Sequence, residues 1–129
     1  KRNFDYMYDF PYDFTSGMKN KTLNNTGFVG TNFKLIIFGA AVNPAVHIAG
    51  HTYQVKCSIG DGEYLTIDSL AKTIMLTKAD GTVVNHFNDR NRESYIFETI
   101  PPGNNAVTWD NTFGFDVILL EERSEPKWT

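Results

Sequence analysis

The sequence has only one cysteine, Cys57, among 129 residues, which excludes an internal disulfide and a zinc site built from several thiolates. Long apolar runs are also missing. The longest, residues 35–42, has eight residues, whereas a membrane-spanning helix needs about 20. Neither sign of charge dominates, because the formal net charge is −3 and the basic residues are scattered. We therefore expect neither a membrane span nor a nucleic-acid partner.

Catalytic signatures are lacking as well. The sequence contains no G-x-S-x-G motif, no phosphate-binding loop and no cluster of residues with metal-ligand spacing. These absences lead us to expect no enzymatic activity, no catalytic residues, no cofactor and no metal site.

Residues that favour long helices are scarce, whereas strand-forming residues are abundant. Ala and Leu together number 14, but Val, Ile and Thr number 30 and aromatic residues 18. β-Branched and aromatic side chains suit pleated sheets. Short alternating runs bounded by turn signals predict about nine or ten strands. The expected fold is an all-β, antiparallel two-sheet sandwich of jelly-roll type, with at most one or two short helices.

Two hairpins and one ambiguous segment follow from the turn residues. Asp80-Gly81 lies between alternating runs at 72–76 and 82–87, and we expect Gly81 to adopt a positive φ there. Ala49-Gly50 similarly separates strands expected at 45–48 and 52–59. Residues 88–93 form a charged loop. Residues 94–100 fit either a short helix capped by Ser94 or a strand, and the sequence does not decide between them.

Polar residues that could perform chemistry have simpler structural interpretations. Cys57 shares an alternating apolar face with Tyr53, Val55 and Ile59, so we expect a buried, slowly reacting thiol.

His47 and His51 have the i, i+4 spacing of a metal pair. They flank a hairpin, however, and no glutamate lies between them, so surface positions are the simpler interpretation. Asp61, Glu63 and Asp68 could be paired hydrolase carboxylates. We instead expect Asp61 to serve a turn and Asp68 to cap a strand end.

Trp109 is the one side chain within the expected strands that could stack on a sugar, with Asp110 and Asn111 beside it to supply hydrogen bonds. The alternative is that Trp109 packs at the edge of the sandwich. Trp128, in the polar C-terminal segment, could anchor onto a neighbouring surface. These four residues are the predicted contacts for a glycan or a protein partner.

Several segments, taken in order, resemble the distal tail proteins of siphophages. The most telling are the GEYLTID strand at 62–68 and the TIPPGNN turn at 99–105. The full set comprises residues 9–14 (DFPYDF), 23–27 (LNNTG), 34–39 (KLIIFG), 43–50 (NPAVHIAG), 62–68 (GEYLTID), 76–81 (LTKADG) and 94–105 (SYIFETIPPGNN).

This resemblance covers nearly the whole chain but only the C-terminal half of the family's protein. It implies that residues 21–122 form a galectin-like β-sandwich. Residues 1–20 would then be a linker or the end of an N-terminal belt domain, and residues 123–129 a C-terminal tail. In the family, the belt domain forms a hexameric ring beneath the tail tube, so we expect the full-length protein to be hexameric and this chain to be a monomer.

The resemblance implies a structural protein of the virion, located at the tail tip after synthesis in the bacterial cytoplasm from a phage or prophage gene. It would act as an attachment platform for other tail and baseplate proteins. The alternative is a carbohydrate-binding module that recognises host surface glycans through Trp109. A hydrolase using Asp61, Glu63 or Asp68 is a third, weaker hypothesis.

Overall fold

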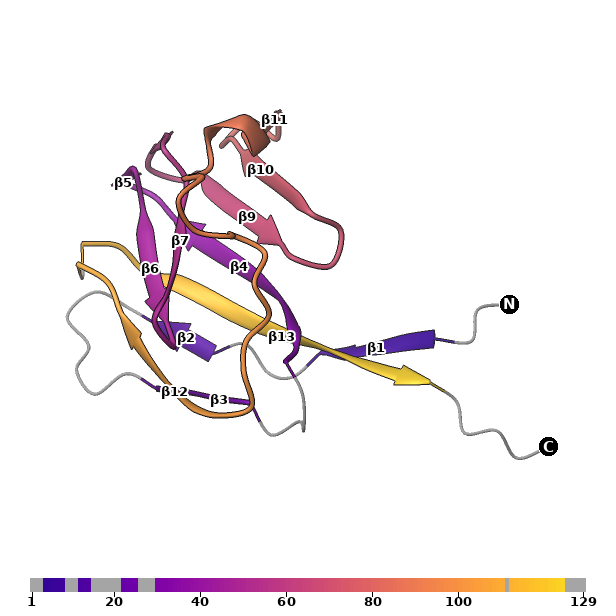
Figure 1. Cartoon of the computed structure of the whole chain (residues 1–129). Coiled ribbons are helices and arrows are strands. Elements are labelled where there is room, and N and C mark those ends of the chain that lie inside the picture. Colours follow the sequence, from indigo (N-terminus) through magenta and orange to yellow (C-terminus); the bar gives the residue numbers. More distant parts are fainter. Residues whose placement is uncertain (1–3, 9–11, 15–21, 26–29, 111, 125–129) are drawn as a thin grey trace.

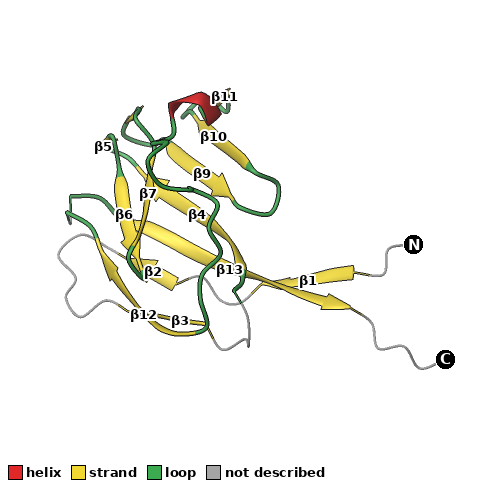
Figure 2. Ribbon diagram, in the orientation of Figure 1, coloured by secondary structure: helices red, strands yellow, loops and turns green. Residues whose placement is uncertain are grey.

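The computed structural model describes residues 4–8, 12–14, 22–25, 30–110 and 112–124. These residues form antiparallel β-sheets with one short 3₁₀ turn, η1 (Phe87–Asp89), as Figures 1 and 2 show. The predicted all-β sandwich is therefore confirmed. Among the described residues, no helix is both long enough and apolar enough to cross a membrane.

The larger sheet has seven strands in the spatial order β1-β13-β4-β9-β10-β11, with β2 also pairing with β13. Its strands are β1 (Phe4–Tyr8), β2 (Tyr12–Phe14), β4 (Asn32–Phe38), β9 (Tyr64–Asp68), β10 (Thr73–Thr77), β11 (Val83–Asn85) and β13 (Phe115–Ser124). Strand β9 lies within residues 62–68, the segment in which the sequence indicates a strand.

The smaller sheet has four strands in the order β3-β12-β6-β7, and β5 and β8 form a separate ladder. These strands are β3 (Thr22–Asn25), β6 (Ala45–Ile48), β7 (His51–Gln54), β12 (Gly103–Thr108), β5 (Ala41–Val42) and β8 (Ser58–Ile59). The described residues contain more strands than the nine or ten expected, because β2, β5 and β8 are too short to produce a recognisable alternation in sequence.

The core lies between the two sheets and follows the period of two. In β4, Phe33, Leu35 and Ile37 are fully buried while the residues between them are partly exposed. Strands β9, β10 and β13 alternate in the same way, and the smaller sheet contributes Val46, Ile48 and other side chains from the opposite side. Strand alternation converts directly into one buried and one open face for each sheet.

Both predicted hairpins are present, but the strand expected at 52–59 is divided into β7, which ends at Gln54, and β8, which pairs with β5. In the turn between β10 and β11, Gly81 has φ = +92°, and the Gly81 N–H donates to the carbonyl oxygen of Lys78 over 2.9 Å. Between β6 and β7, Ala49 and Gly50 have φ values of +53° and +85°, which is the left-handed pair that suits a two-residue hairpin loop. Glycine tolerates this conformation because it has no Cβ.

The segment from η1 to β12 connects the two sheets along one side of the sandwich (Figure 2). This segment runs alongside β7 and the residue after it. Val55 forms a bridge with Arg90, and the Tyr53 hydroxyl donates to the Glu98 carbonyl oxygen over 2.7 Å. Residues 94–100 are neither a helix nor a strand, although Ile100 forms an isolated bridge with Thr31. Ile96 and Phe97 are nevertheless buried, so this segment closes the side of the core.

Strand β13 is longer than its neighbours. Its first six residues pair with β4, and residues 120–124 pair with β1. The part of the larger sheet formed by β1 and the end of β13 extends beyond the rest of the sandwich in Figure 1. Phe4 pairs with Ser124, so the chain reaches and leaves the sandwich through adjacent strands.

Candidate functional site

Trp109 is packed into the structure and does not present an open ring. The side chain is 8% exposed, and its indole N–H donates to the carbonyl oxygen of Phe113 over 2.9 Å. The rings of Phe14 and Phe115 meet the indole edge-on, with centroids 5.8 and 4.6 Å away. Of the two interpretations of Trp109, packing is therefore the one the structure adopts.

A shallow depression of about 440 Å³ nevertheless lies beside this tryptophan, on the outer face of the smaller sheet. The cross-strand pairs Ala45–Gln54 and His47–Thr108 bring side chains from β6, β7 and β12 together there. The depression is lined by Asn43, Ala45, His47, Gln54, Thr108, Trp109 and Asp110. Its rim is polar, but most of the indole face is covered.

Of the other three predicted contact residues, Asp110 is described by the structure and lines the same depression. The Asp110 carboxylate accepts hydrogen bonds from the N–H and hydroxyl of Thr112, over 3.0 and 2.7 Å, and thereby orders its own turn. Asn111 and Trp128 lie outside the described residues.

The two histidines of the first hairpin lie on opposite faces of the smaller sheet. His47 pairs with Thr52 and is exposed, with its Nδ1 3.1 Å from the Thr52 hydroxyl. His51 pairs with Ile48, whose side chain faces the core. Residues paired across an antiparallel ladder share a face, so the two imidazoles diverge. No group of three or more histidine, cysteine or acidic side chains suited to a metal occurs among the described residues.

The three carboxylates considered for hydrolysis contact backbone groups or solvent. The Asp68 carboxylate accepts the N–H groups of Leu70 and Ala71, both over 3.0 Å, as expected for a residue that caps a strand end. The Glu63 carboxylate accepts the N–H of Gly60 over 2.8 Å. Asp61 is exposed in the turn before β9.

Cys57 is buried, with 9% of its surface exposed, as its place in the alternating pattern predicted. Burial is the main reason that the pKa of this thiol rises to about 11, and the nearby Asp89 carboxylate raises it further. A high pKa keeps the sulfur protonated near neutral pH, where the thiolate is the reactive form. The rate of its reaction with thiol reagents remains a prediction.

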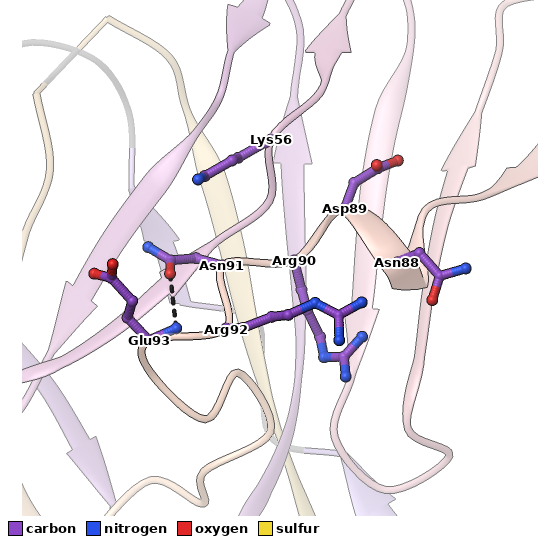
Figure 3. A pocket seen from close by; sticks show the side chains of 7 residues that line it. All are labelled: Lys56, Asn88, Asp89, Arg90, Asn91, Arg92 and Glu93. Atoms are coloured by element: carbon purple, nitrogen blue, oxygen red, sulfur yellow. Dashed lines mark hydrogen bonds between the residues drawn. The ribbon is translucent and has the colours of Figure 1, made fainter.

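A second depression lies at the charged loop, which the sequence did not identify as a site. It has a volume of about 360 Å³ and is lined by Lys56 and by every residue from Asn88 to Glu93 (Figure 3). A smaller one, of about 240 Å³, adjoins it and shares Arg90 and Arg92 as lining residues. The Arg-x-Arg spacing at 90–92 was the available signal, because it concentrates two positive charges in three residues of the loop.

Several contacts hold this loop in place. The Lys56 N–H donates to the Asp89 carbonyl oxygen over 2.8 Å, and the Asn91 N–H donates to the Gln54 carbonyl oxygen over 2.9 Å. The Asn91 side chain adds a 2.8 Å hydrogen bond from Nδ2 to Oε1 of Gln54. The loop is therefore attached to β7 and to the segment that follows it through both backbone and side chain.

Comparison with known proteins identifies no relative: no family model matches the chain, and neither a curated protein nor a solved structure matches it significantly.

Proposed function

We propose that this chain is a structural component of a siphophage or prophage tail. It would be the C-terminal domain of a distal tail protein that serves as an attachment platform for other baseplate proteins at the tail tip. The observation that carries the proposal is the series of resembling segments, which keep their order along nearly the whole chain. The resemblance implies a β-sandwich, and this chain folds as one.

The ladder formed by β1 and the end of β13 adds support. A domain that projects from a ring needs a firm connection to it. Two paired strands leaving one end of the sandwich make a stiffer connection than one unpaired segment, because each strand restrains the other through backbone hydrogen bonds. This arrangement suits a platform that holds partners at a set position.

The carbohydrate-binding alternative has one observation in its favour, which is the polar rim of the depression beside Trp109. Sugar binding commonly uses an aromatic face for stacking, and here the aromatic side chain is 8% exposed. Glycan-array screening of the chain separates the two proposals. Binding that is lost in Thr108→Ala and His47→Ala, two exposed rim positions, would favour a glycan-binding module.

The tail proposal is tested most directly on the complete gene product. Negative-stain electron microscopy is expected to show rings with six projecting domains, while the 129-residue chain alone is expected to scatter light as a monomer. The coding neighbourhood gives a second test: a tape-measure gene upstream and a tail-lysin or fibre gene downstream are expected. A gene set unrelated to virion assembly, together with a complete product that forms no ring, would overturn the proposal.

A further inference from the structure

The charged loop holds two arginines on one side of the chain. Arg90 has an extended backbone, with φ = −69° and ψ = 150°, and the preceding turn of η1 ends at Asp89. Arg92 follows two residues later, at the start of a turn, and Asn91 between the two arginines is bonded to Gln54 through both its backbone and its side chain. Figure 3 shows both guanidinium groups on one side of the loop, with the Glu93 carboxylate on the opposite side.

Arg90 is held in a defined position. Its guanidinium carbon lies 4.0 Å from the centroid of the Phe87 ring, and its Nη1 donates to the Phe87 carbonyl oxygen over 2.7 Å. The Phe87 ring is in turn stacked on Phe97, which is buried in the core. This stack fixes one guanidinium before any ligand arrives and leaves most of its five N–H donors available.

Arg92 is exposed beside it, and neither arginine forms an ion pair with any described residue. Of the two acidic residues in the loop, Asp89 is engaged elsewhere, because its Oδ2 lies 2.7 Å from Nδ1 of His86, and the Glu93 carboxylate lies on the opposite side in Figure 3. Two like charges held on one side of a loop repel each other, and an anion between them would remove that repulsion. Lys56 also lines this depression, but in Figure 3 its ammonium group lies on the side of Glu93, away from the two guanidinium groups.

An aromatic ring and a hydroxyl complete the surroundings. The adjoining depression is lined by Ser94 and Tyr95 in addition to the two arginines and Ile96. Tyr95 is 56% exposed, and its ring meets Phe97 edge-on at a centroid distance of 6.0 Å. The exposed ring therefore borders the positively charged groups from a position supported by the core.

From this arrangement we propose that Arg90 and Arg92 bind a phosphate or sulfate group, with Tyr95 contacting whatever the group is attached to. Guanidinium forks match the oxygen atoms of such groups through paired hydrogen bonds. Two adjacent forks suit a tetrahedral dianion better than a planar carboxylate with a single charge. The inference depends on the loop's own contacts and is independent of the tail-protein proposal.

The experiment is a titration of the ¹⁵N-labelled chain, followed by ¹H–¹⁵N correlation spectra, at an ionic strength held constant with chloride. The probes are inorganic phosphate, sulfate, acetate and glucose 6-phosphate. We expect saturable shifts of the amide signals of residues 89–95 with phosphate and sulfate, and weaker binding of acetate. No saturable shift with any probe, or tighter binding of acetate than of phosphate, would overturn the proposal.

Matched variants distinguish a specific phosphate site from nonspecific electrostatic attraction of phosphate to the whole chain. Arg92→Gln is expected to weaken phosphate binding about tenfold, since one charged hydrogen-bonding partner is lost. Arg92→Lys keeps the charge without the fork and is expected to give an intermediate affinity. Lys78→Gln removes an equal charge from the exposed turn between β10 and β11 and is expected to bind phosphate as the unmodified chain does. Equal weakening by Lys78→Gln and Arg92→Gln would refute the site.

Glucose 6-phosphate and Tyr95→Ala identify the source of the group. If the natural ligand is a phosphate ester, glucose 6-phosphate is expected to bind more tightly than inorganic phosphate, and Tyr95→Ala is expected to remove the difference. Equal affinity for both probes in the unmodified chain assigns the site to free phosphate. In either case the failure of ring assembly in the complete gene product leaves this result unaffected.

Discussion

Two surface regions, the depression beside Trp109 and the loop at 88–93, differ in whether the fold leaves their candidate binding side chains available to a ligand. Tryptophan is a residue type that often binds ligands, but Trp109 is packed into the structure. Its indole N–H donates to the Phe113 carbonyl oxygen, and two phenylalanine rings contact it. In the loop, the less conspicuous arginines stand on a supported backbone without an ion pair to any described residue. Whether a residue can bind a ligand therefore depends on whether packing and hydrogen bonds within the fold already occupy its side chain.

The physical reason for the contrast is that burial lowers the free energy of an indole but raises that of a guanidinium group. Burial of the large apolar surface of an indole is strongly favourable, so an indole near a core tends to be buried in it. A guanidinium loses favourable hydration when it is buried, so the fold keeps it at the surface and packs only its flat face, as Arg90 does on Phe87.

Trp109→Ala is expected to have the largest effect on stability. Removing a packed indole leaves a cavity beside Phe14 and Phe115, and we expect the free energy of unfolding to fall by about 3–5 kcal/mol. Urea unfolding followed by far-ultraviolet circular dichroism measures it. Trp109→Phe keeps part of the packing and is the control, with a smaller loss. An unchanged unfolding midpoint for Trp109→Ala would mean that this side chain is not part of the core.

The buried thiol beneath the loop is expected to make stability depend on alkaline pH. The pKa of Cys57 is about 11 in the folded chain against an ordinary value of 9.0, so between these values the unfolded chain loses a proton that the folded chain retains. The contribution is fully present below pH 9 and declines as pH rises toward 11, by about 1–2 kcal/mol in total. Unfolding in urea at a series of pH values measures this decline.

Cys57→Ala is the control for that experiment, because it removes the titrating group. Its stability is expected to fall less steeply between pH 9 and 10 than that of the unmodified chain. Burial also raises the pKa of Tyr53 well above its ordinary value, with Glu98 contributing, which adds a further decline at still higher pH in both chains. Identical slopes for the two chains would show that the thiol does not titrate in this range.

Asn91→Ala tests the attachment of the loop. It removes the 2.8 Å hydrogen bond to Gln54 and the acceptor of the Glu93 N–H, and we expect a loss of about 1 kcal/mol in unfolding free energy. Faster amide hydrogen exchange in residues 89–95 should accompany it. Asn88→Ala, at an exposed position of the same loop, serves as the control and is expected to leave both measurements unchanged.

Arg92→Gln is expected to have the smallest effect, a change of no more than about 0.5 kcal/mol in unfolding free energy. The side chain is exposed and forms no ion pair with any described residue. Thermal unfolding measures it. A substantial stabilisation would show that repulsion between the two arginines is larger than supposed, whereas a substantial destabilisation would mean that Arg92 has a structural role, and the contrast with Trp109 would fail.

Much of the fold could be predicted because strands and tight turns produce patterns among residues that are close in the sequence. The alternation at 64–68 and the Asp80-Gly81 turn depend on neighbouring residues alone, and both were located correctly. Residues 94–100 could not be assigned in the same way. Their conformation depends on contacts with distant residues, among them the bond from Tyr53 to Glu98 and the bridge of Ile100 with Thr31.

The candidate site shows the same limit. The sequence singled out Trp109 and Asp110 by residue type, yet the chain packs the first and uses the second to order its own turn. It described residues 88–93 only as charged. Whether their charges face one another, pair or stand apart depends on where Gln54, Phe87 and Phe97 lie in the folded chain.

The sequence by itself determined the β-class, the two hairpins and the burial of Cys57, because backbone geometry and the period of two act between residues close along the chain. The tertiary structure alone decided which face of each sheet meets the other, that Trp109 is covered, and that Arg90 rests on Phe87 while Arg92 stays free of ion pairs with the described residues. Those outcomes depend on the packing of segments far apart in sequence, and competition for burial among them cannot be evaluated until the chain has folded.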